Sequence, residues 1–299
     1  MTTLLAIVLT LGAAICLNYA MYLTKKAVDL LPAVKFEVSF HVFKAFVTNR
    51  PWVTATALSV VGGGVYAVAI AMAPVSIVQP ILASGVVLLA YLAIKNLGER
   101  PRTSDYYAIG MTVLGVALIG VSLAEGIPET VKHDPVELWV FAAIVTVIAV
   151  IMPLVMRHER QAAGLGISVG LFFGLAAIFG RLLLVDWTGQ WGAKGIAVTI
   201  SSVFVIPWAL TFIAGFIMMQ AALQRGMAVV VVPLLSGLSQ VVPILGGMIA
   251  LNEPFPNSVM LSALRVIGFC LILVGTVVLS RRAEEVSPAT EPGELGAIN

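Results

Sequence analysis

The run from Pro51 to Ile94 contains no Asp, Glu, Lys or Arg. One bilayer crossing takes about 20 apolar residues in a helix, so this single run has room for two crossings. Similar charge-free runs cover 106–124, 138–156, 161–180, 195–224, 226–252 and 266–280. The chain is 60% hydrophobic and 11% charged, whereas soluble domains are roughly 45–50% apolar and about 25% charged. The sequence therefore predicts an all-α polytopic membrane protein.

The apolar segments predict ten helices, at 3–24, 33–48, 51–73, 75–97, 104–124, 136–157, 163–187, 196–224, 227–250 and 257–280. The second is short and amphipathic, with a reach of about 25 Å at ~1.5 Å per residue. It either crosses as one of ten spans or leaves nine. Nine spans place the N-terminus outside and follow the positive-inside rule better. Ten spans preserve an internal repeat, and ten is the number we expect.

The internal repeat appears when the sequence is shifted by 153 residues. Two halves of five helices are expected, 1–125 and 135–280, followed by a disordered cytoplasmic tail at 281–299. An odd number of spans in each half inserts the second half upside down, and inverted repeats of this kind are a hallmark of transporters. The matched positions are Gly62 with Gly215, Ala69 with Ala222 and Pro80 with Pro233, then Glu99 with Glu253 one residue out of step, and Gly115 with Gly275.

These positions also carry a family resemblance. A short link, a proline-containing helix, a closing Leu-Gly-Glu or Leu-Asn-Glu and a glycine-rich helix occur twice. The residues are Ala73-Pro74, Pro80, Gly98-Glu99-Arg100 and Gly115, then Gly226-Met227-Ala228, Pro233, Asn252-Glu253 and Gly275. In this the chain resembles the drug/metabolite transporter (DMT) superfamily, and more narrowly its EamA-like and NIPA-like branches. The resemblance implies a multi-pass transporter of the cell (inner) membrane.

Several function classes lack support in the sequence. No glycine-rich loop is followed by Lys, as ATP-driven transport would need, and His41, His133 and His158 lack metal-ligand spacing. Basic residues sit at helix ends rather than in one patch, which argues against nucleic acid as a partner. We therefore expect that the protein is not an enzyme and that it holds no cofactor or resident metal. Its expected partners are a small-molecule substrate, the bilayer, and protons or another coupling ion.

The first candidate for the substrate pathway is a stripe of three polar residues on the short second helix, Glu37, His41 and Lys44. If this helix crosses, charged groups at membrane depth mark an ion or substrate route. Glu37 would then be the proton-coupling carboxylate and His41 a relay. The alternative is an amphipathic helix at the interface with these groups in water.

Two arginines and a tryptophan are further candidates. Arg181 and Arg265 fall within long apolar helices toward the outer side, where they either snorkel to lipid headgroups or offer positive charge to an anionic substrate. Trp208, next to Pro207, is expected near the middle of the helix at 196–224. It would form either core packing or a cavity wall there.

The last candidates are uncharged residues on two helices. One face of the helix at 227–250 carries Ser236, Gln240, Pro243 and Gly247, and their proposed counterparts in the first half are Gln79, Pro80 and Ser84. Pro80 and Pro233 occupy matching positions in the two halves, which points either to the pathway or to packing kinks. The glycines are expected to let helices approach closely, namely Gly62, Gly63, Gly64, Gly166, Gly170 and Gly174.

The main hypothesis is a secondary transporter that moves a small metabolite or drug-like solute by alternating access. An alternative is a NIPA-like divalent-cation (magnesium) transporter, although no carboxylate occupies the centre of a long helix and Mg²⁺ prefers carboxylate oxygens. The embedded arginines favour an organic or anionic solute instead. A third reading is a non-transporting membrane scaffold or a subunit of a lipid-modifying system. Two halves suffice for one pathway, so a dimer is not required.

Overall fold

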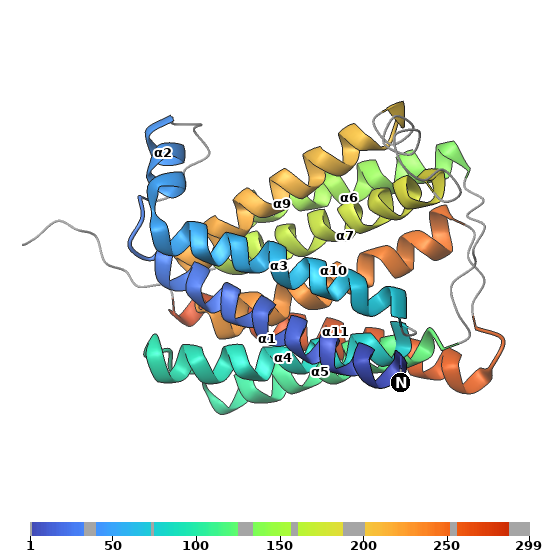
Figure 1. The fold of residues 1–299 in the computed structure, drawn as a ribbon, viewed down its shortest axis with the longest axis horizontal. Coiled ribbons are helices and arrows are strands. Elements are labelled where there is room, and N and C mark those ends of the chain that lie inside the picture. The colour runs from blue at the N-terminus through green and yellow to red at the C-terminus, as the bar shows by residue number, and fades with distance from the viewer. Residues whose placement is uncertain are drawn as a thin grey trace, which may run out of the picture.

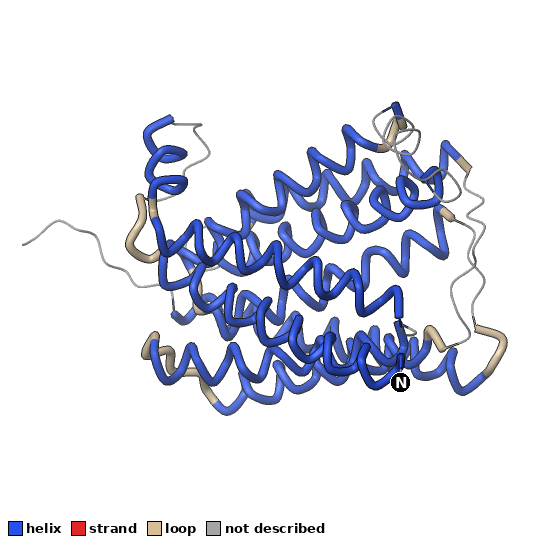
Figure 2. The backbone as a smooth tube through the Cα atoms, viewed as in Figure 1, coloured by secondary structure: helices blue, strands red, loops and turns tan. Residues whose placement is uncertain are grey.

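The computed structural model describes residues 2–32, 40–72, 75–124, 134–156, 161–187, 201–251 and 256–286. These residues form helices and short connections, with no strand among them (Figure 2). The helices lie roughly along one direction as a bundle (Figure 1). Within the described ranges, eight helices are long and apolar enough to cross a membrane. The prediction of an all-helical, multi-pass integral membrane protein is confirmed.

The helices are α1 (Thr2–Val28), α2 (Phe40–Thr48), α3 (Arg50–Met72), α4 (Val75–Asn96), α5 (Thr103–Ser122), α6 (Pro135–Val155), α7 (Gln161–Trp187), α9 (Val205–Arg225), α10 (Ala228–Ala250) and α11 (Val259–Val286). Beside the eight helices, α4 is 22 residues long and packs against α1 and α5. At ~1.5 Å per residue it also reaches the thickness of a bilayer core. We therefore count nine crossing helices in the part of the chain that is described.

The expectation of ten crossings is wrong, because α2 does not span. It has nine residues, roughly 13 Å at about 1.5 Å per residue, and the hydrocarbon core is about 30 Å thick. It also connects two helix ends that lie at the same end of the bundle. Lys25, near the end of α1, and Trp52, at the start of α3, donate to neighbouring residues of α9, Leu223 and Gln220.

Local sequence explains where several helices begin and end. At the start of α6, Asp134 accepts a hydrogen bond from the backbone N–H of Val136, and Pro135 occupies the first turn. The helix expected at 196–224 begins instead at Val205, after a turn at 203–204. Pro207 therefore falls in the first turn of α9, where a proline leaves no helical hydrogen bond unmade. The helix end expected at residue 280 is also wrong, since α11 continues to Val286.

The centre of the bundle is α7, in which 83% of the apolar span is buried. Glycines on one face of this helix let it approach α10. A Cβ atom added at Gly170 would lie 2.6 Å from the Cβ of Leu238, and one added at Gly174 would lie 2.5 Å from the Cβ of Val242. The prediction of close packing is confirmed for α7. In α3 it holds for Gly62, which meets Leu17 and Cys16, but not for Gly63 or Gly64.

A second close crossing joins α5 and α11 at Gly115 and Gly268. A Cβ added at Gly115 would lie 2.7 Å from the carbonyl oxygen of Gly268, and a Cβ added at Gly268 would lie 2.8 Å from the carbonyl oxygen of Gly115. Small residues at such crossings allow the backbone contact that drives helix association in lipid.

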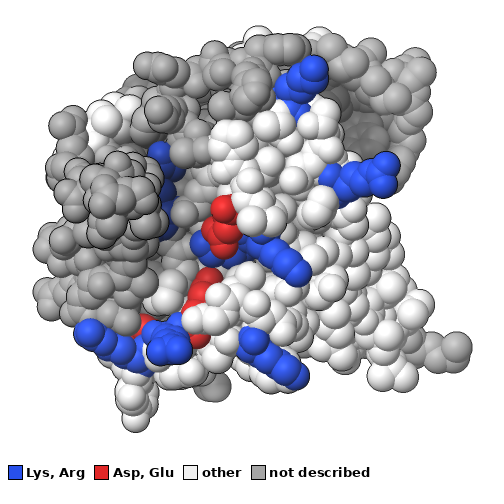
Figure 3. All heavy atoms as spheres, turned by 90° about the vertical axis from the view of Figure 1, so that its left-hand side faces the viewer, with Lys and Arg blue, Asp and Glu red and all other residues white. Residues whose placement is uncertain are grey.

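The Lys and Arg residues of the loops and helix ends gather at one end of the bundle, which we call the basic end. The described members are Lys25, Lys26, Lys44, Arg50, Lys95, Arg100, Arg102 and Arg225. Figure 3 looks at this end and shows basic side chains around a few acidic ones. The positive-inside rule assigns this end to the cytoplasm. With nine crossings, the N-terminus then lies outside.

We expect Gly115→Val to destabilise the protein by about 1–3 kcal/mol, because the new side chain overpacks the α5–α11 crossing. Thermal unfolding in detergent measures the effect. Gly110→Val on the same helix is the matched control, since a Cβ there meets nothing within 4 Å. Equal unfolding temperatures for the two variants would contradict the crossing.

The nine-crossing topology is tested by thiol labelling. In a background without Cys16 and Cys270, a cysteine at Leu30, which is 82% exposed beside the end of α1, is expected to react in intact cells only after permeabilisation. A tag at the N-terminus is expected to be accessible without it. Protection of the N-terminus together with labelling at Leu30 from outside would refute this orientation.

Candidate substrate cavity

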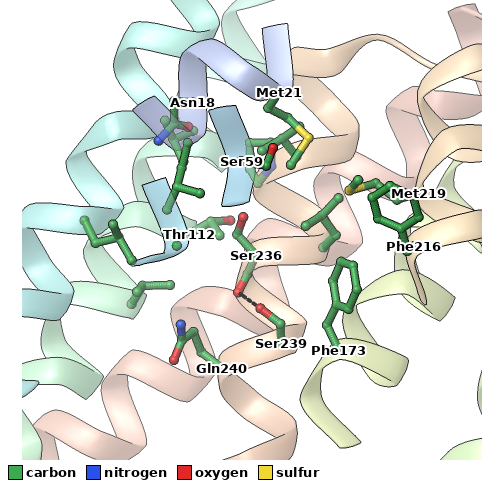
Figure 4. A pocket seen from close by; sticks show the side chains of 18 of the residues that line it. Asn18, Met21, Ser59, Thr112, Phe173, Phe216, Met219, Ser236, Ser239 and Gln240 are labelled. Carbon is green, nitrogen blue, oxygen red and sulfur yellow. Dashed lines mark hydrogen bonds between the residues drawn. The ribbon is translucent and has the colours of Figure 1, made fainter. Parts of the chain in front are cut away.

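A cavity of about 680 Å³ lies between α1, α3, α4, α5, α7, α9 and α10. Helices from both ends of the sequence contribute to it, so it forms only when the chain has assembled. Its polar lining residues come mainly from α1, α3, α5 and α10 and converge from several sides (Figure 4). They are Asn18, Thr56, Ser59, Thr112, Ser236, Ser239 and Gln240.

The polar part of the wall offers mainly hydrogen-bond acceptors. The hydroxyls of Ser59, Thr112 and Ser239 donate to the carbonyl oxygens of Ala55, Ala108 and Ser236, at 3.1, 3.0 and 2.9 Å. The Asn18 amide nitrogen donates to the carbonyl oxygen of Ala14 at 2.9 Å. The three hydroxyls thus spend their single donors on their own helices and keep oxygen lone pairs for the cavity, while the Asn18 amide keeps its carbonyl oxygen and one N–H donor.

Asn18 is held in place by the helix beside it. A Cβ added at Gly85 of α4 would collide with the Asn18 amide nitrogen. The absence of a side chain at Gly85 therefore leaves the space that the Asn18 amide occupies.

The remaining wall is apolar and aromatic. Phe173 of α7 and Phe212 of α9 lie with ring centroids 5.7 Å apart, and Phe216 and Met219 continue this wall along α9 (Figure 4). No Asp, Glu, Lys, Arg or His is among the lining residues that the structure describes. The cavity is consequently uncharged, with an acceptor-rich side and an aromatic side.

Three of the predicted pathway residues lie on this wall, namely Pro233, Ser236 and Gln240, all on α10. Pro233 is inside the helix, where it leaves the carbonyl of Val229 without its helical partner. Gln79 and Pro80 belong to α4 by their backbone, but their side chains lie outside the described part of the structure. The neighbouring Leu82 and Val86 line the cavity from the same helix.

The other candidates lie elsewhere. Lys44 is exposed on α2 at the basic end, so the part of the polar stripe that can be placed is interfacial and does not enter the bundle. Glu37 and the side chain of His41 lie outside the described residues. Trp208 is 39% exposed near the start of α9, with its ring stacked on Phe212. Because Pro207 starts the helix rather than bending its middle, Trp208 sits at the membrane boundary, where tryptophans are enriched.

Arg265 is 7% exposed, but it does not line the cavity. Its Nε donates to the Ser122 hydroxyl at 3.2 Å and its Nη2 to the Ser122 carbonyl at 3.3 Å. Ser122 is the last residue of α5, so a cation from α11 meets the negative end of that helix. Arg181 is likewise absent from the cavity wall. The expectation that these two arginines face a substrate in this cavity is not supported by their positions.

Sequence reasoning missed Asn18, Thr56, Ser59 and Thr112 as lining residues. A signal was present, since Asn18 is a lone amide in the middle of an apolar segment. Ser and Thr carry no such signal, because they also bond to their own helix anywhere in a membrane span. Only the packing of the helices shows which of them face the cavity.

The class of protein that follows from this geometry is an integral, multi-pass α-helical membrane protein with a polar cavity between its helices. Within the described residues, no group of three or more His, Cys, Asp or Glu side chains could hold a metal ion.

Comparison with known proteins adds one relative. The chain is 27% identical over 288 residues, 92% of its length and 81% of the relative's, to a protein of Arabidopsis thaliana named "Probable magnesium transporter NIPA9". No family model matches the chain. No solved structure matches it. The relative is named as a transporter and not as an enzyme, in agreement with the prediction that this chain is not an enzyme.

Arg265→Leu is expected to destabilise the protein by about 1–3 kcal/mol, because the end of α5 loses two hydrogen bonds from a buried cation. Thermal unfolding measures this effect. The solute concentration that gives half-maximal flux is expected to stay unchanged, since Arg265 is not on the cavity wall. A large rise in the solute concentration for half-maximal flux, with unchanged stability, would show instead that Arg265 contacts the solute.

Proposed function

We propose that this protein is a secondary transporter of a divalent cation, of the magnesium class, with the cavity as its solute site. The observation that carries the proposal is the likeness to a probable magnesium transporter over 92% of the chain. The acceptor-rich wall of the cavity supports it, because lone pairs of amide and hydroxyl oxygens attract a cation or its bound water and repel an anion.

The size of the cavity suits a hydrated ion. Six waters occupy about 180 Å³ at about 30 Å³ each, and the cavity measures about 680 Å³. Mg²⁺ gives up its water reluctantly and usually keeps several water ligands. A wall of neutral oxygens would hold such an ion through its water shell. Weak contacts of this kind permit release as well as binding, which transport requires.

An inverted repeat is part of the proposal, in a form that differs from the one expected from sequence. In one half α1 packs on α3 and α4, and α4 packs on α5; in the other α7 packs on α9 and α10, and α10 packs on α11. The pairs α3/α9, α4/α10 and α5/α11 contain the matched positions Gly62/Gly215, Pro80/Pro233 and Gly115/Gly275.

On this scheme α1 matches α7, and α6 is an added crossing between the halves. Each half then has four crossing helices instead of five. With α6 between them, the second half still starts from the opposite side of the membrane. Cavities at the interface of such repeats are the usual substrate sites of secondary transporters.

A small organic solute is the second candidate, favoured by the aromatic wall of Phe173, Phe212 and Phe216. The argument from embedded arginines no longer supports an anionic solute. The resemblance to the drug/metabolite transporter superfamily and the assignment to the cell membrane remain proposals, and both are compatible with either solute.

The test is uptake into proteoliposomes that contain a magnesium-sensitive dye. We expect Mg²⁺ uptake by the wild type, and Thr112→Val is expected to reduce it roughly fivefold, corresponding to about 1 kcal/mol for the loss of one acceptor at nearly constant shape. Ser84→Ala is the matched control, because this hydroxyl is exposed on α4 and is not on the cavity wall. Flux of an organic solute without Mg²⁺ flux would favour the second candidate, and no flux of any solute would favour a scaffold.

A further inference from the structure

At the basic end, two helices that are far apart in sequence cap each other. Lys25 of α1 donates from its ammonium to the carbonyl oxygen of Leu223 at 2.6 Å and to the Asp29 carboxylate at 2.7 Å. In return, the amide nitrogen of Gln224 donates to the carbonyl oxygens of Val28 at 3.0 Å and Pro32 at 3.1 Å. The carbonyls at the ends of α1 and α9 thus find partners in the other helix.

Glu99 joins the same end of the bundle to α10. Its carboxylate oxygens accept hydrogen bonds from the backbone N–H groups of Ala228 at 2.7 Å and Val229 at 3.0 Å. The residue that precedes α10, Met227, provides no side-chain cap of its own. Glu99 lies in the loop between α4 and α5 and is only 8% exposed. A carboxylate from one half of the chain therefore caps a helix of the other.

These contacts close the basic end of the cavity. Leu89, Leu223 and Val229 are fully buried in the apolar core that lies at this end of the bundle. At the basic end, the ring of Trp52 in α3 lies against that of Phe216 in α9. The two helices diverge toward the opposite end of the bundle (Figure 1). If α10 and the end of α9 separate from α1 and the Glu99 loop, these contacts break and the buried core at the basic end opens.

We propose that Glu99 is the latch of a gate at the basic end, where its buried carboxyl caps α10 when the gate is closed and is hydrated when this gate opens. Because α10 carries Pro233, Ser236 and Gln240 on the cavity wall, release of its first turn changes the cavity and the gate together. The inference rests on one part of the proposed function, namely that the solute passes through the cavity.

The charged groups near Glu99 are few. Lys25 and Asp29 act on it from α1, and Arg100 and Arg102 are exposed on its own loop. Arg225 of α9 donates to the carbonyl oxygen of Ala221 in its own helix. The first turn of α10 presents backbone N–H groups and apolar side chains.

The sign of the pH effect follows from these surroundings. Burial raises the pKa of Glu99 above its ordinary value, and Asp29 adds to this, while the two backbone N–H groups and Lys25 act in the opposite direction. In water the carboxyl returns to its ordinary pKa, so the closed gate binds the proton more tightly than the open gate does. Acid therefore favours the closed gate. As pH rises through the raised pKa this preference is lost.

The experiment measures access to the cavity from the basic end. In a background of Cys16→Ala and Cys270→Ala, Ser59→Cys places a thiol on the cavity wall. A membrane-impermeant maleimide is added on the basic side of inside-out vesicles, and the labelling rate is followed with pH. Thiolate formation also speeds the reaction as pH rises. Each rate is therefore divided by that of Ser104→Cys, an exposed position at the same end.

We expect the corrected labelling rate to rise with pH. Across the whole pH range, the ratio of open to closed protein is expected to change by up to about tenfold for each unit by which the pKa of Glu99 is raised in the closed state. Glu99→Gln is expected to abolish this dependence.

Asp29→Asn keeps the Glu99 carboxyl but removes a charge that raises its pKa. The midpoint of the pH profile is therefore expected to move to lower pH. Asp105→Asn is the control, because this buried carboxylate caps α5 within one half, through the backbone N–H of Arg102, and the pH profile is expected to persist.

A flat or falling wild-type profile would overturn the proposal, as would a Glu99→Gln variant that keeps the wild-type profile. If Glu99→Gln does not fold, as judged by size-exclusion chromatography, the Asp29→Asn shift decides, and an unmoved midpoint overturns the latch. Labelling requires no magnesium. A flat profile with intact Mg²⁺ uptake would therefore refute the latch alone, and a pH-dependent profile without Mg²⁺ uptake would refute the proposed solute alone.

Discussion

The structure depends on the inability of lipid to hydrogen-bond the polypeptide backbone. Every peptide group at membrane depth must find its partner within a helix, and every charge must reach an end of the bundle or another polar group. The basic residues at one end satisfy this constraint by reaching water. Arg265 satisfies it differently, by meeting the last residue of α5. Both arrangements keep charges off the cavity wall that the structure describes, and the cavity has therefore to work with neutral oxygens.

The same constraint explains why helix ends matter so much here. Backbone groups at a helix end lack partners within that helix, and at the basic end they are paired across the two halves of the chain. Lys25 donates to a carbonyl oxygen at the end of α9, and Gln224 donates to one at the end of α1. Glu99 accepts a hydrogen bond from a backbone N–H at the start of α10. Contacts that stabilise a helix end also hold α1 and the loop at Glu99 against α9 and α10. A movement that separates these elements must replace the lost partners with water.

Sequence reasoning succeeded where one residue type has one physical use in a membrane. Long apolar runs predicted the spans, and regularly spaced glycines on α7 predicted a close helix contact, which the structure places against α10. It failed where one residue type has two uses. Pro207 was expected near the middle of a helix, but it lies in the first turn of one. The amphipathic segment ending at Thr48 has an apolar face that suits a helix crossing the membrane as well as one lying on its surface. Only the packing of α3 beside α1 distinguishes these two arrangements.

The amino-acid sequence by itself determined that this chain enters a membrane many times as helices, because apolar length and the position of charges act locally along the chain. It also identified Ser236 and Gln240 as part of one helix face. The tertiary structure alone decided that this face meets Asn18 and Thr112 across a cavity, that the arginines are elsewhere, and that Glu99 reaches α10 over 129 residues of sequence. Such contacts depend on which helices pack together, and packing in lipid is set by shape and by buried polar partners that no single segment contains.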